Sequence, residues 1–218
     1  MALFGTEHLA VLLLTAAVSA AMIRFATGRA PGRVLALVLL AAQIADPFIA
    51  AHYGWLNIRN ALPIELCDAA AFAVILALWT HRIAVFELAY YWGLTGTVQA
   101  MLSPDLPFHF PHPEFIRFFV LHGGIVVGVL YLAAGVRLQP RPHAMGRAFG
   151  WTVVYAIGVG LVDWLLEANY MYLRSKPSGA SPLDWFGPWP WYILGGAGIG
   201  LALFFLASLP YRFGRRVE

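Results

Sequence analysis

The chain contains a single cysteine, Cys67, and one histidine placed well inside an apolar run, His122. A cysteine thiol can attack an acyl carbonyl when a histidine accepts its proton, so this pair could support acyl transfer through a covalent intermediate. A lone cysteine in an apolar segment can equally be a small hydrophobic residue, and the nearby carboxylates of Glu65 and Asp68 disfavour a resting thiolate. Both interpretations stay open, with Cys67 and His122 as the candidate catalytic residues.

Metal chemistry is a second possibility. His109 and His112 lie in one loop, and Asp105, His122 or Asp163 could complete a ligand set. The helical HxxxH and HExxH spacings of zinc sites are missing, and prolines bend the loop. The sequence therefore predicts no metal and no cofactor, and it leaves open whether the two loop histidines bind one.

The composition indicates where such chemistry would take place. Of the 218 residues, 61% are hydrophobic and 11% are charged. Soluble domains carry about 25% charged residues, so this chain has too few to cover a surface that faces water. A soluble enzyme, a disordered chain and a disulfide-stapled module are excluded. The net charge of +3 does not indicate nucleic-acid binding, because the arginines are scattered and most lie at the ends of apolar runs.

Seven apolar segments are long enough to cross a bilayer, for which a helix needs about 20 residues. They are residues 8–25, 34–53, 62–80, 83–102, 114–136, 145–168 and 188–209. Short connections with proline or glycine separate several of them. We therefore predict an all-α polytopic membrane protein, a bundle of seven transmembrane helices that forms one domain over residues 1–218. The predicted location is the cell membrane.

Two patterns indicate how these helices meet. The GxxxG spacing, which permits close approach of helices, occurs at Gly124–Gly128, Gly146–Gly150 and Gly196–Gly200. The fourth segment carries a polar stripe at steps of four that should face the bundle interior, made of Glu87, Tyr91, Thr95 and Gln99. For Glu87 we expect a structural role, in hydrogen bonds between helices.

The basic residues predict the orientation. Most of the 14 Lys and Arg residues lie on one side of the predicted bundle, and the richer side is the cytoplasmic one in membrane proteins. The N-terminus should then lie outside and the C-terminus in the cytoplasm. Nine polar residues within the segments fall in the outer half, and only Glu87 lies near the cytoplasmic end. The nine are Asp46, Glu65, Cys67, Asp68, Gln99, Arg117, His122, Asp163 and Glu167.

This one-sided distribution predicts a polar cavity that opens toward the outer leaflet or the outer water. Each ionisable group inside a bilayer costs about 2.5–3.5 kcal/mol on insertion scales and needs a partner or a function. Asp163 and Glu167 lie four residues apart on one helix face, so either one of them holds a proton or Arg117 pairs with them.

Two transport or sensing classes can be compared with this pattern. A retinal-type photoreceptor is excluded, because its Schiff base needs a lysine in the seventh segment and the only lysine, Lys176, lies in a loop. A proton-coupled carrier should have carboxylates through the full membrane thickness, whereas the inner half offers only Glu87. The carrier remains a third alternative.

Several strings resemble those of a known family. They are LPIELCD at 62–68, ELAYYWG at 87–93, FFVLHGG at 118–124, NYMYL at 169–173, KP at 176–177 and GPWPWY at 187–192. Together they resemble the YwaF-like family of bacterial integral membrane proteins, over nearly the whole chain. The bacterial members are largely uncharacterised. An animal branch is similar to a lipid transacylase that remodels ether phospholipids with a cysteine and a histidine.

The resemblance implies roles for two residues. His122 matches the family histidine. In the animal branch the cysteine directly follows the proline, at the position of Ile64 here, and a histidine replaces Glu65, whereas bacterial members keep the cysteine at Cys67. Ile64 and Cys67 should share a helix face if the helix begins near Pro63. Either Cys67 acts as the nucleophile one helical turn further along the chain, or the thiol chemistry belongs to the animal branch alone.

We therefore expect a membrane-embedded lipid acyltransferase or hydrolase that acts on membrane lipids, with Cys67 as nucleophile and His122 as general base. Arg117, Asp163 or Glu167 would orient the base or hold a headgroup. The remaining candidate substrate-binding residues are Asp46, Glu65, Asp68 and Gln99. The rival hypothesis is a non-catalytic lipid- or solute-binding membrane protein whose polar cluster recognises a headgroup. The sequence does not indicate the oligomeric state.

Overall fold

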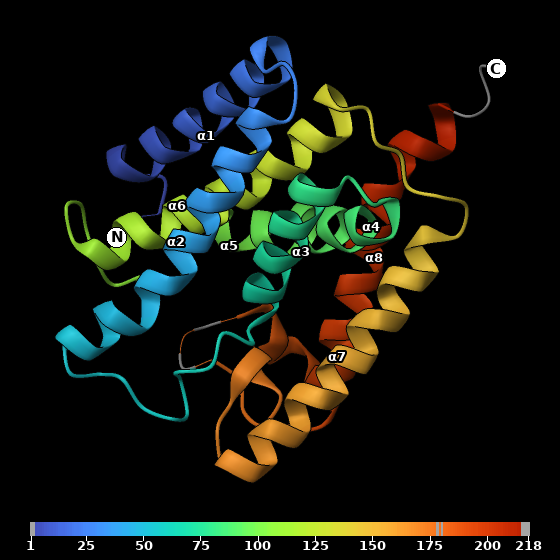
Figure 1. The fold of residues 1–218 in the computed structure, drawn as a ribbon. Coiled ribbons are helices and arrows are strands. Elements are labelled where there is room, and N and C mark those ends of the chain that lie inside the picture. Colours follow the sequence, from blue (N-terminus) through green and yellow to red (C-terminus); the bar gives the residue numbers. More distant parts are fainter. Residues whose placement is uncertain (1–2, 178, 180, 215–218) are drawn as a thin grey trace.

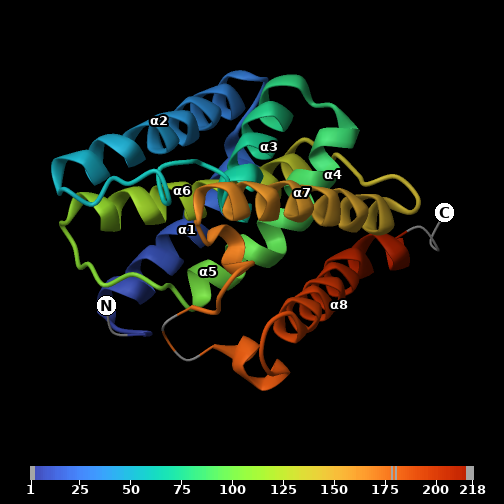
Figure 2. The same ribbon diagram turned by 90° about the horizontal axis from the view of Figure 1, so that it is seen from below.

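The computed structural model describes residues 3–177, 179 and 181–214, and within these ranges it contains helices and no strand. Figures 1 and 2 show the arrangement in two views. The elements are α1 (Thr6–Phe25), α2 (Ala30–His52), α3 (Leu66–Thr80), α4 (Ile83–Trp92), η1 (Gly93–Thr97), α5 (Val98–Leu102), α6 (Pro113–Leu130), η2 (Tyr131–Gly135), α7 (Ala144–Leu166), η3 (Tyr170–Tyr172), η4 (Pro182–Phe186) and α8 (Trp191–Gly214).

Each predicted apolar segment contains a helix, because each run of apolar residues ends at turn-forming or polar residues. Five helices in the described part of the chain are long and apolar enough to cross a membrane, and they are Thr6–Phe25, Ala30–His52, Pro113–Gly135, Ala144–Leu166 and Trp191–Tyr211. The helix α3 has 15 residues, and the run α4–η1–α5 contains a π-helical stretch. The chain is thus an all-helical, multi-pass membrane protein.

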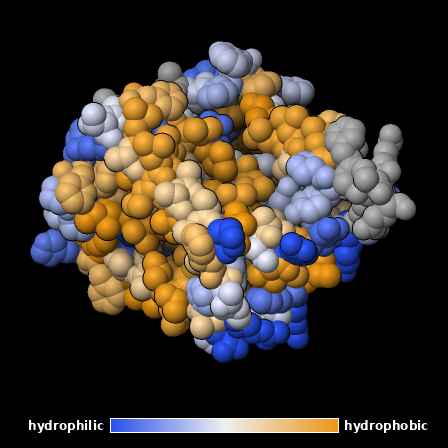
Figure 3. Space-filling view, turned by 90° about the horizontal axis from the view of Figure 1, so that it is seen from above, coloured by the Kyte–Doolittle hydropathy of each residue, from blue (hydrophilic) through white to orange (hydrophobic). Residues whose placement is uncertain are grey.

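The surface agrees with a lipid environment. Large apolar side chains are widely exposed on several of the long helices, for example Leu13 on α1, Phe48 on α2 and Trp164 on α7. Soluble proteins rarely expose such extended apolar surface. The face drawn in Figure 3 carries broad apolar areas, with hydrophilic residues mainly toward its rim.

The central helix α3 packs against α2, α4 and α6. It can be buried on several sides because its sequence is apolar nearly all round and rich in alanine. The predicted close approach at Gly124–Gly128 of α6 is confirmed. A Cβ atom on Gly124 would lie 2.8 Å from Leu39 of α2, and one on Gly128 would lie 2.6 Å from Val74 of α3. Both distances are shorter than ordinary Cβ contacts, so a side chain at Gly124 would displace the end of the Leu39 side chain and one at Gly128 would displace the stiffer Val74.

The other two GxxxG pairs behave differently. A Cβ atom on Gly146 or Gly150 would meet no atom of the described chain within 4 Å, so this pair is not a contact face between its helices and the expectation was wrong. Gly196 faces Leu183 of η4, and a Cβ atom on Gly200 would also meet nothing within 4 Å. The GxxxG spacing alone does not distinguish glycines at a helix contact from glycines that face no other helix, because glycine is common throughout membrane helices.

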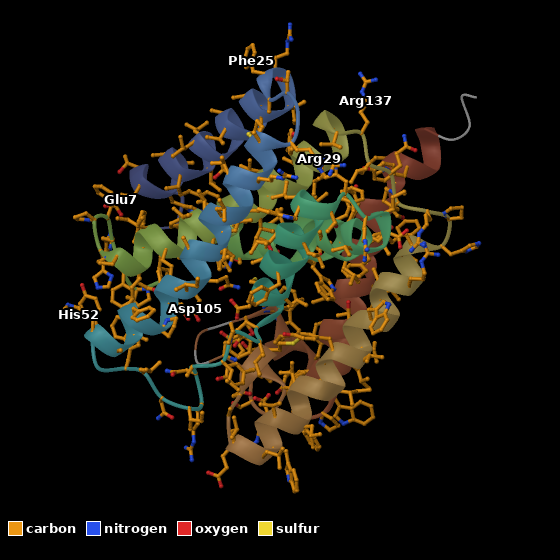
Figure 4. All side chains as sticks on the ribbon, in the orientation of Figure 1. Glu7, Phe25, Arg29, His52, Asp105 and Arg137 are labelled. Carbon is orange, nitrogen blue, oxygen red and sulfur yellow. The ribbon has the colours of Figure 1, made fainter. Side chains whose placement is uncertain are left out.

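Charged and polar residues lie at two ends of the molecule. Figure 4 shows Phe25, Arg29 and Arg137 toward its top and Glu7, His52 and Asp105 toward its left. In the first group, Phe25 ends α1, Arg29 directly precedes α2 and Arg137 follows η2. In the second group, Glu7 lies at the start of α1, His52 ends α2 and Asp105 lies in the α5–α6 loop. The helices therefore run between these two ends.

Glu87 of α4 is 3% exposed and binds two arginines. Its carboxylate accepts hydrogen bonds from the Arg141 backbone N–H at 2.8 Å and from the guanidinium groups of Arg141 and Arg147, each at 2.8 Å. This arrangement joins α4 to α7 and to the segment that leads into it. The expected structural role of Glu87 is confirmed.

We expect Glu87→Gln to lower the free energy of unfolding by about 2 kcal/mol, because the substitution removes the charge-assisted hydrogen bonds that a buried carboxylate accepts from two half-exposed arginines. Thermal unfolding of the purified protein in detergent would measure this loss. The matched control is Glu7→Gln, since Glu7 pairs with exposed His109 and an exposed pair contributes about 1 kcal/mol or less. An equal, small shift for both variants would contradict the structural role.

Candidate functional site

A cavity of about 590 Å³ lies where α2 ends and where α3 and α6 begin, and we call it the polar chamber. The loops after α5 and α7 complete its walls. Its polar lining residues are Asp46, Arg59, Asn60, Glu65, Cys67, Asp68, Ser103, Asp105, Glu114, Arg117, His122, Asn169, Tyr170 and Tyr172. The predicted residues that meet in it are Asp46, Glu65, Cys67, Asp68, Arg117 and His122. These side chains come from three helices far apart in the sequence.

The imidazole of His122 is held in one orientation on α6. Its Nδ1 donates a hydrogen bond to the carbonyl of Phe118 at 2.8 Å, and its ring stacks on the Phe118 ring with centroids 4.0 Å apart. A carbonyl only accepts hydrogen bonds, so Nδ1 carries the proton and Nε2 presents a lone pair. Nε2 makes no hydrogen bond with any described residue. A buried histidine that lines a polar cavity in this way can accept a proton there.

Cys67 lies nearer the start of its helix than the sequence predicted. The helix α3 begins at Leu66, not near Pro63, because Glu65 and Asp68 form a capping box in which the Glu65 N–H donates to Asp68 Oδ2 at 3.0 Å. Cys67 is therefore the second residue of α3, in the first turn, where the helix dipole stabilises negative charge. The buried hydroxyl of Thr97 lies next to its thiol but makes no regular hydrogen bond.

The later start of α3 also corrects the expectation for Ile64. Ile64 precedes the helix, so it does not share a helix face with Cys67. It packs in an apolar cluster with Val159, Ala168 and Tyr170, and its carbonyl accepts a hydrogen bond from the Tyr155 hydroxyl at 2.9 Å. Within the described chain, Cys67 lines the polar chamber and Ile64 does not.

Arg117 lies between two carboxylates of the chamber. Its Nε is 2.7 Å from Glu114 Oε2 and 3.0 Å from Asp46 Oδ1, and its terminal nitrogen also contacts Glu114. Of the two alternatives for Asp163 and Glu167, the pairing with Arg117 is therefore ruled out. Glu114 stands one turn before Arg117 on the same helix and is the nearer partner.

Asp163 and Glu167 do not share a site. Asp163 is fully buried and its Oδ1 accepts from the Tyr170 N–H at 2.8 Å. The helix α7 ends at Leu166, and Glu167 takes a left-handed conformation with φ of 53°. Its carboxylate is 70% exposed and pairs with Arg59 at 2.7 Å. The two carboxylates therefore diverge, which the i,i+4 spacing could not indicate once the helix had ended.

Gln99 also lies outside the polar chamber. Its amide donates to the Ser103 hydroxyl at 2.9 Å, and its side chain lines a second, apolar cavity beside the chamber. The rest of the predicted stripe is confirmed, since Glu87, Tyr91 and Thr95 are all buried.

Sequence reasoning missed the segment that closes the chamber after α7. The Tyr170 hydroxyl accepts a hydrogen bond from the Leu62 N–H at 3.0 Å, and the Met171 N–H donates to Glu65 Oε2 at 2.8 Å. Burial raises the pKa of both Tyr170 and Tyr172, so their hydroxyls stay protonated at neutral pH. The NYMYL string was the available signal for this segment.

The loop histidines take other partners. His109 pairs with Glu7 at 3.0 Å, and the His112 ring accepts a hydrogen bond from the Glu114 N–H at 3.1 Å and stacks on Phe108. In the described part of the chain no three His, Cys, Asp or Glu side chains are grouped as metal ligands.

Comparisons with known proteins place the chain in a family. The model of the TMEM164 family matches residues 3–208, which include every residue discussed above. No curated protein and no solved structure matches the chain. The YwaF-like name stays a prediction. Because the match covers nearly the whole length, the chain belongs to the TMEM164 family of membrane proteins.

Proposed function

We propose that this protein is a membrane-embedded lipid acyltransferase in which Cys67 is the nucleophile and His122 the general base. One observation carries the proposal, namely that both side chains line the same polar chamber while the His122 Nδ1–H bond leaves Nε2 unprotonated. The bond to the Phe118 carbonyl acts as the orienting interaction that a nucleophile–base pair requires.

The reaction proceeds in two steps, acylation of the Cys67 thiol and transfer of the acyl group to a second lipid. The Cys67 thiol gives its proton to His122 Nε2, and its sulfur attacks the acyl carbonyl of a lipid ester. A C–S bond forms, the ester C–O bond breaks, and the proton on Nε2 passes to the leaving oxygen, which departs as the hydroxyl of a lysolipid. A hydroxyl of a second lysolipid then gives its proton to Nε2 and attacks the thioester. The C–S bond breaks, a new ester forms, and the proton returns to the thiol.

The start of α3 supports this chemistry. Its first-turn N–H groups, including those of Leu66 and Cys67, have no carbonyl partner within the helix, as at the start of any helix. Such donors beside the nucleophile would stabilise the negative oxygen of the tetrahedral intermediate. The neighbouring carboxylates of Glu65 and Asp68 disfavour a resting thiolate. A mechanism in which a neutral thiol gives its proton to a neutral imidazole during the attack therefore suits this site.

The membrane arrangement is part of the proposal. We propose seven spans in the cell membrane, in which α3 and α4–η1–α5 are the shorter members, with the N-terminus outside and the chamber in the outer half. The distribution of basic residues supports this orientation, since Arg29 and Arg137 lie toward the end opposite to Asp105, which lines the chamber.

Substitution of the catalytic pair gives the first test. Cys67→Ala should abolish acyl exchange, and His122→Ala should lower its rate by about 100-fold or more, because a positioned base contributes at least that much. The assay follows transfer of a deuterated acyl chain from phosphatidylcholine to a lysophospholipid in vesicles, by mass spectrometry. His109→Ala is the matched control, since its ring lies in the outer loop and pairs with Glu7.

Full acyl exchange by the Cys67→Ala protein would remove the thiol from the mechanism. A non-catalytic lipid-binding protein would instead show weaker lipid retention in His122→Ala, with no change in any lipid's chemical identity. Labelling of Cys67 by an acyl-activated probe separates the two, because saturable labelling that depends on His122 requires the base.

The orientation has its own test. In a Cys67→Ala background, Asp105→Cys should react with a membrane-impermeant maleimide in intact cells, and Arg137→Cys only after permeabilisation, because the two residues lie toward opposite ends of the molecule. The reverse pattern would place the chamber on the cytoplasmic side.

A further inference from the structure

A second cavity, of about 340 Å³, lies beside the polar chamber between η1, α5, α7 and α8, and we call it the apolar groove. Phe149, Leu173, Ile193, Leu203 and Phe204 are among the side chains that line it. Figure 2 shows α8 at the edge of the molecule, and α8 contacts α7. Both helices are long and apolar enough to span a membrane, so the groove lies at the depth of lipid hydrocarbon.

Four of the polar side chains on the groove walls donate hydrogen bonds within the protein. The hydroxyls of Thr95 and Thr152 donate to carbonyls one turn back on their own helices, at 2.6 and 2.8 Å. The Tyr192 hydroxyl donates to the Tyr172 carbonyl at 2.8 Å, and the Gln99 amide donates to a serine hydroxyl at 2.9 Å. An occupant therefore meets walls that are mostly apolar and on which these four side chains already have hydrogen-bond acceptors, which suits a hydrocarbon chain.

The apolar groove adjoins the polar chamber. Tyr172 lines both cavities. Leu66 lines the groove and the next residue, Cys67, lines the chamber, and the same step occurs from Gln99 to Ala100. The candidate nucleophile thus stands at the junction between polar and apolar walls.

Small residues leave the space that forms the groove. Gly96 of η1, Ala156 of α7, and Gly196, Ala197 and Gly200 of α8 all line it. A Cβ atom on Gly200 would meet nothing within 4 Å, so a larger side chain there could enter the groove without displacing the backbone.

We infer that the apolar groove holds one hydrocarbon chain of the lipid whose ester lies beside Cys67 and His122. This inference rests on the proposed function, because it requires an amphiphile in the polar chamber. Two cavities of opposite polarity that share a wall residue fit a molecule with a polar and an apolar part, and a phospholipid in the surrounding bilayer is such a molecule.

Photocrosslinking tests the inference without turnover. The probe is a phosphatidylcholine with a diazirine at the end of one acyl chain, in vesicles that hold the Cys67→Ala protein. Crosslinks should fall on groove-lining residues of α7 and α8. Gly200→Phe should lower their yield by about tenfold or more, because overpacking of a filled site costs at least that much in occupancy.

Gly198→Phe is the matched control, since a Cβ atom on Gly198 of α8 also meets nothing within 4 Å but Gly198 does not line the groove. Ala197→Leu repeats the test should Gly200→Phe fail to fold. Undiminished groove crosslinks in both filled variants, or crosslinks confined to outward-facing residues, would overturn the inference. Groove labelling together with full acyl exchange in the Cys67→Ala protein would refute the proposed catalysis and leave the chain-binding site standing.

Discussion

The segment after α7 is held by two carboxylates, one on α7 and one at the start of α3, and the site depends on this attachment. Asp163 binds the Tyr170 N–H, and Glu65 binds the Met171 N–H. Buried backbone donors of an irregular segment must find such acceptors, especially in a membrane, where water cannot replace them. The attachment closes the polar chamber and also places Tyr172 between the two cavities.

The charged residues form two kinds of arrangement in the molecule. In one, Glu87 and its two arginines form a closed cluster in which the buried carboxylate is matched by hydrogen bonds. In the other, the charged groups surround a cavity, and Arg117 is shared between Asp46 and Glu114 on the wall. The first arrangement holds helices together, and the second leaves room for a ligand with polar groups.

The sequence predicted the helices well, because long apolar runs separated by proline, glycine and arginine allow few other structures in a membrane. It also predicted that Cys67 and His122 lie near the same end of their segments, and both side chains line the polar chamber. It placed the start of α3 too early, since the capping box of Glu65 and Asp68 competes with the helix-starting preference of Pro63. The separation of the Asp163 and Glu167 side chains depends on the left-handed backbone conformation of Glu167, which no local sequence pattern predicted.

The backbone of the segment that bears Tyr172 is itself unfavourable. Met171 and Tyr172 both have φ of 54°, a left-handed conformation that costs an ordinary L-residue about 1 kcal/mol or more. The hydrogen bonds from Met171 to Glu65 and from the Tyr192 hydroxyl to the Tyr172 carbonyl offset that cost. A bound molecule that took over either bond would let this segment relax toward an ordinary backbone conformation, so the wall between the two cavities could change shape when a ligand binds.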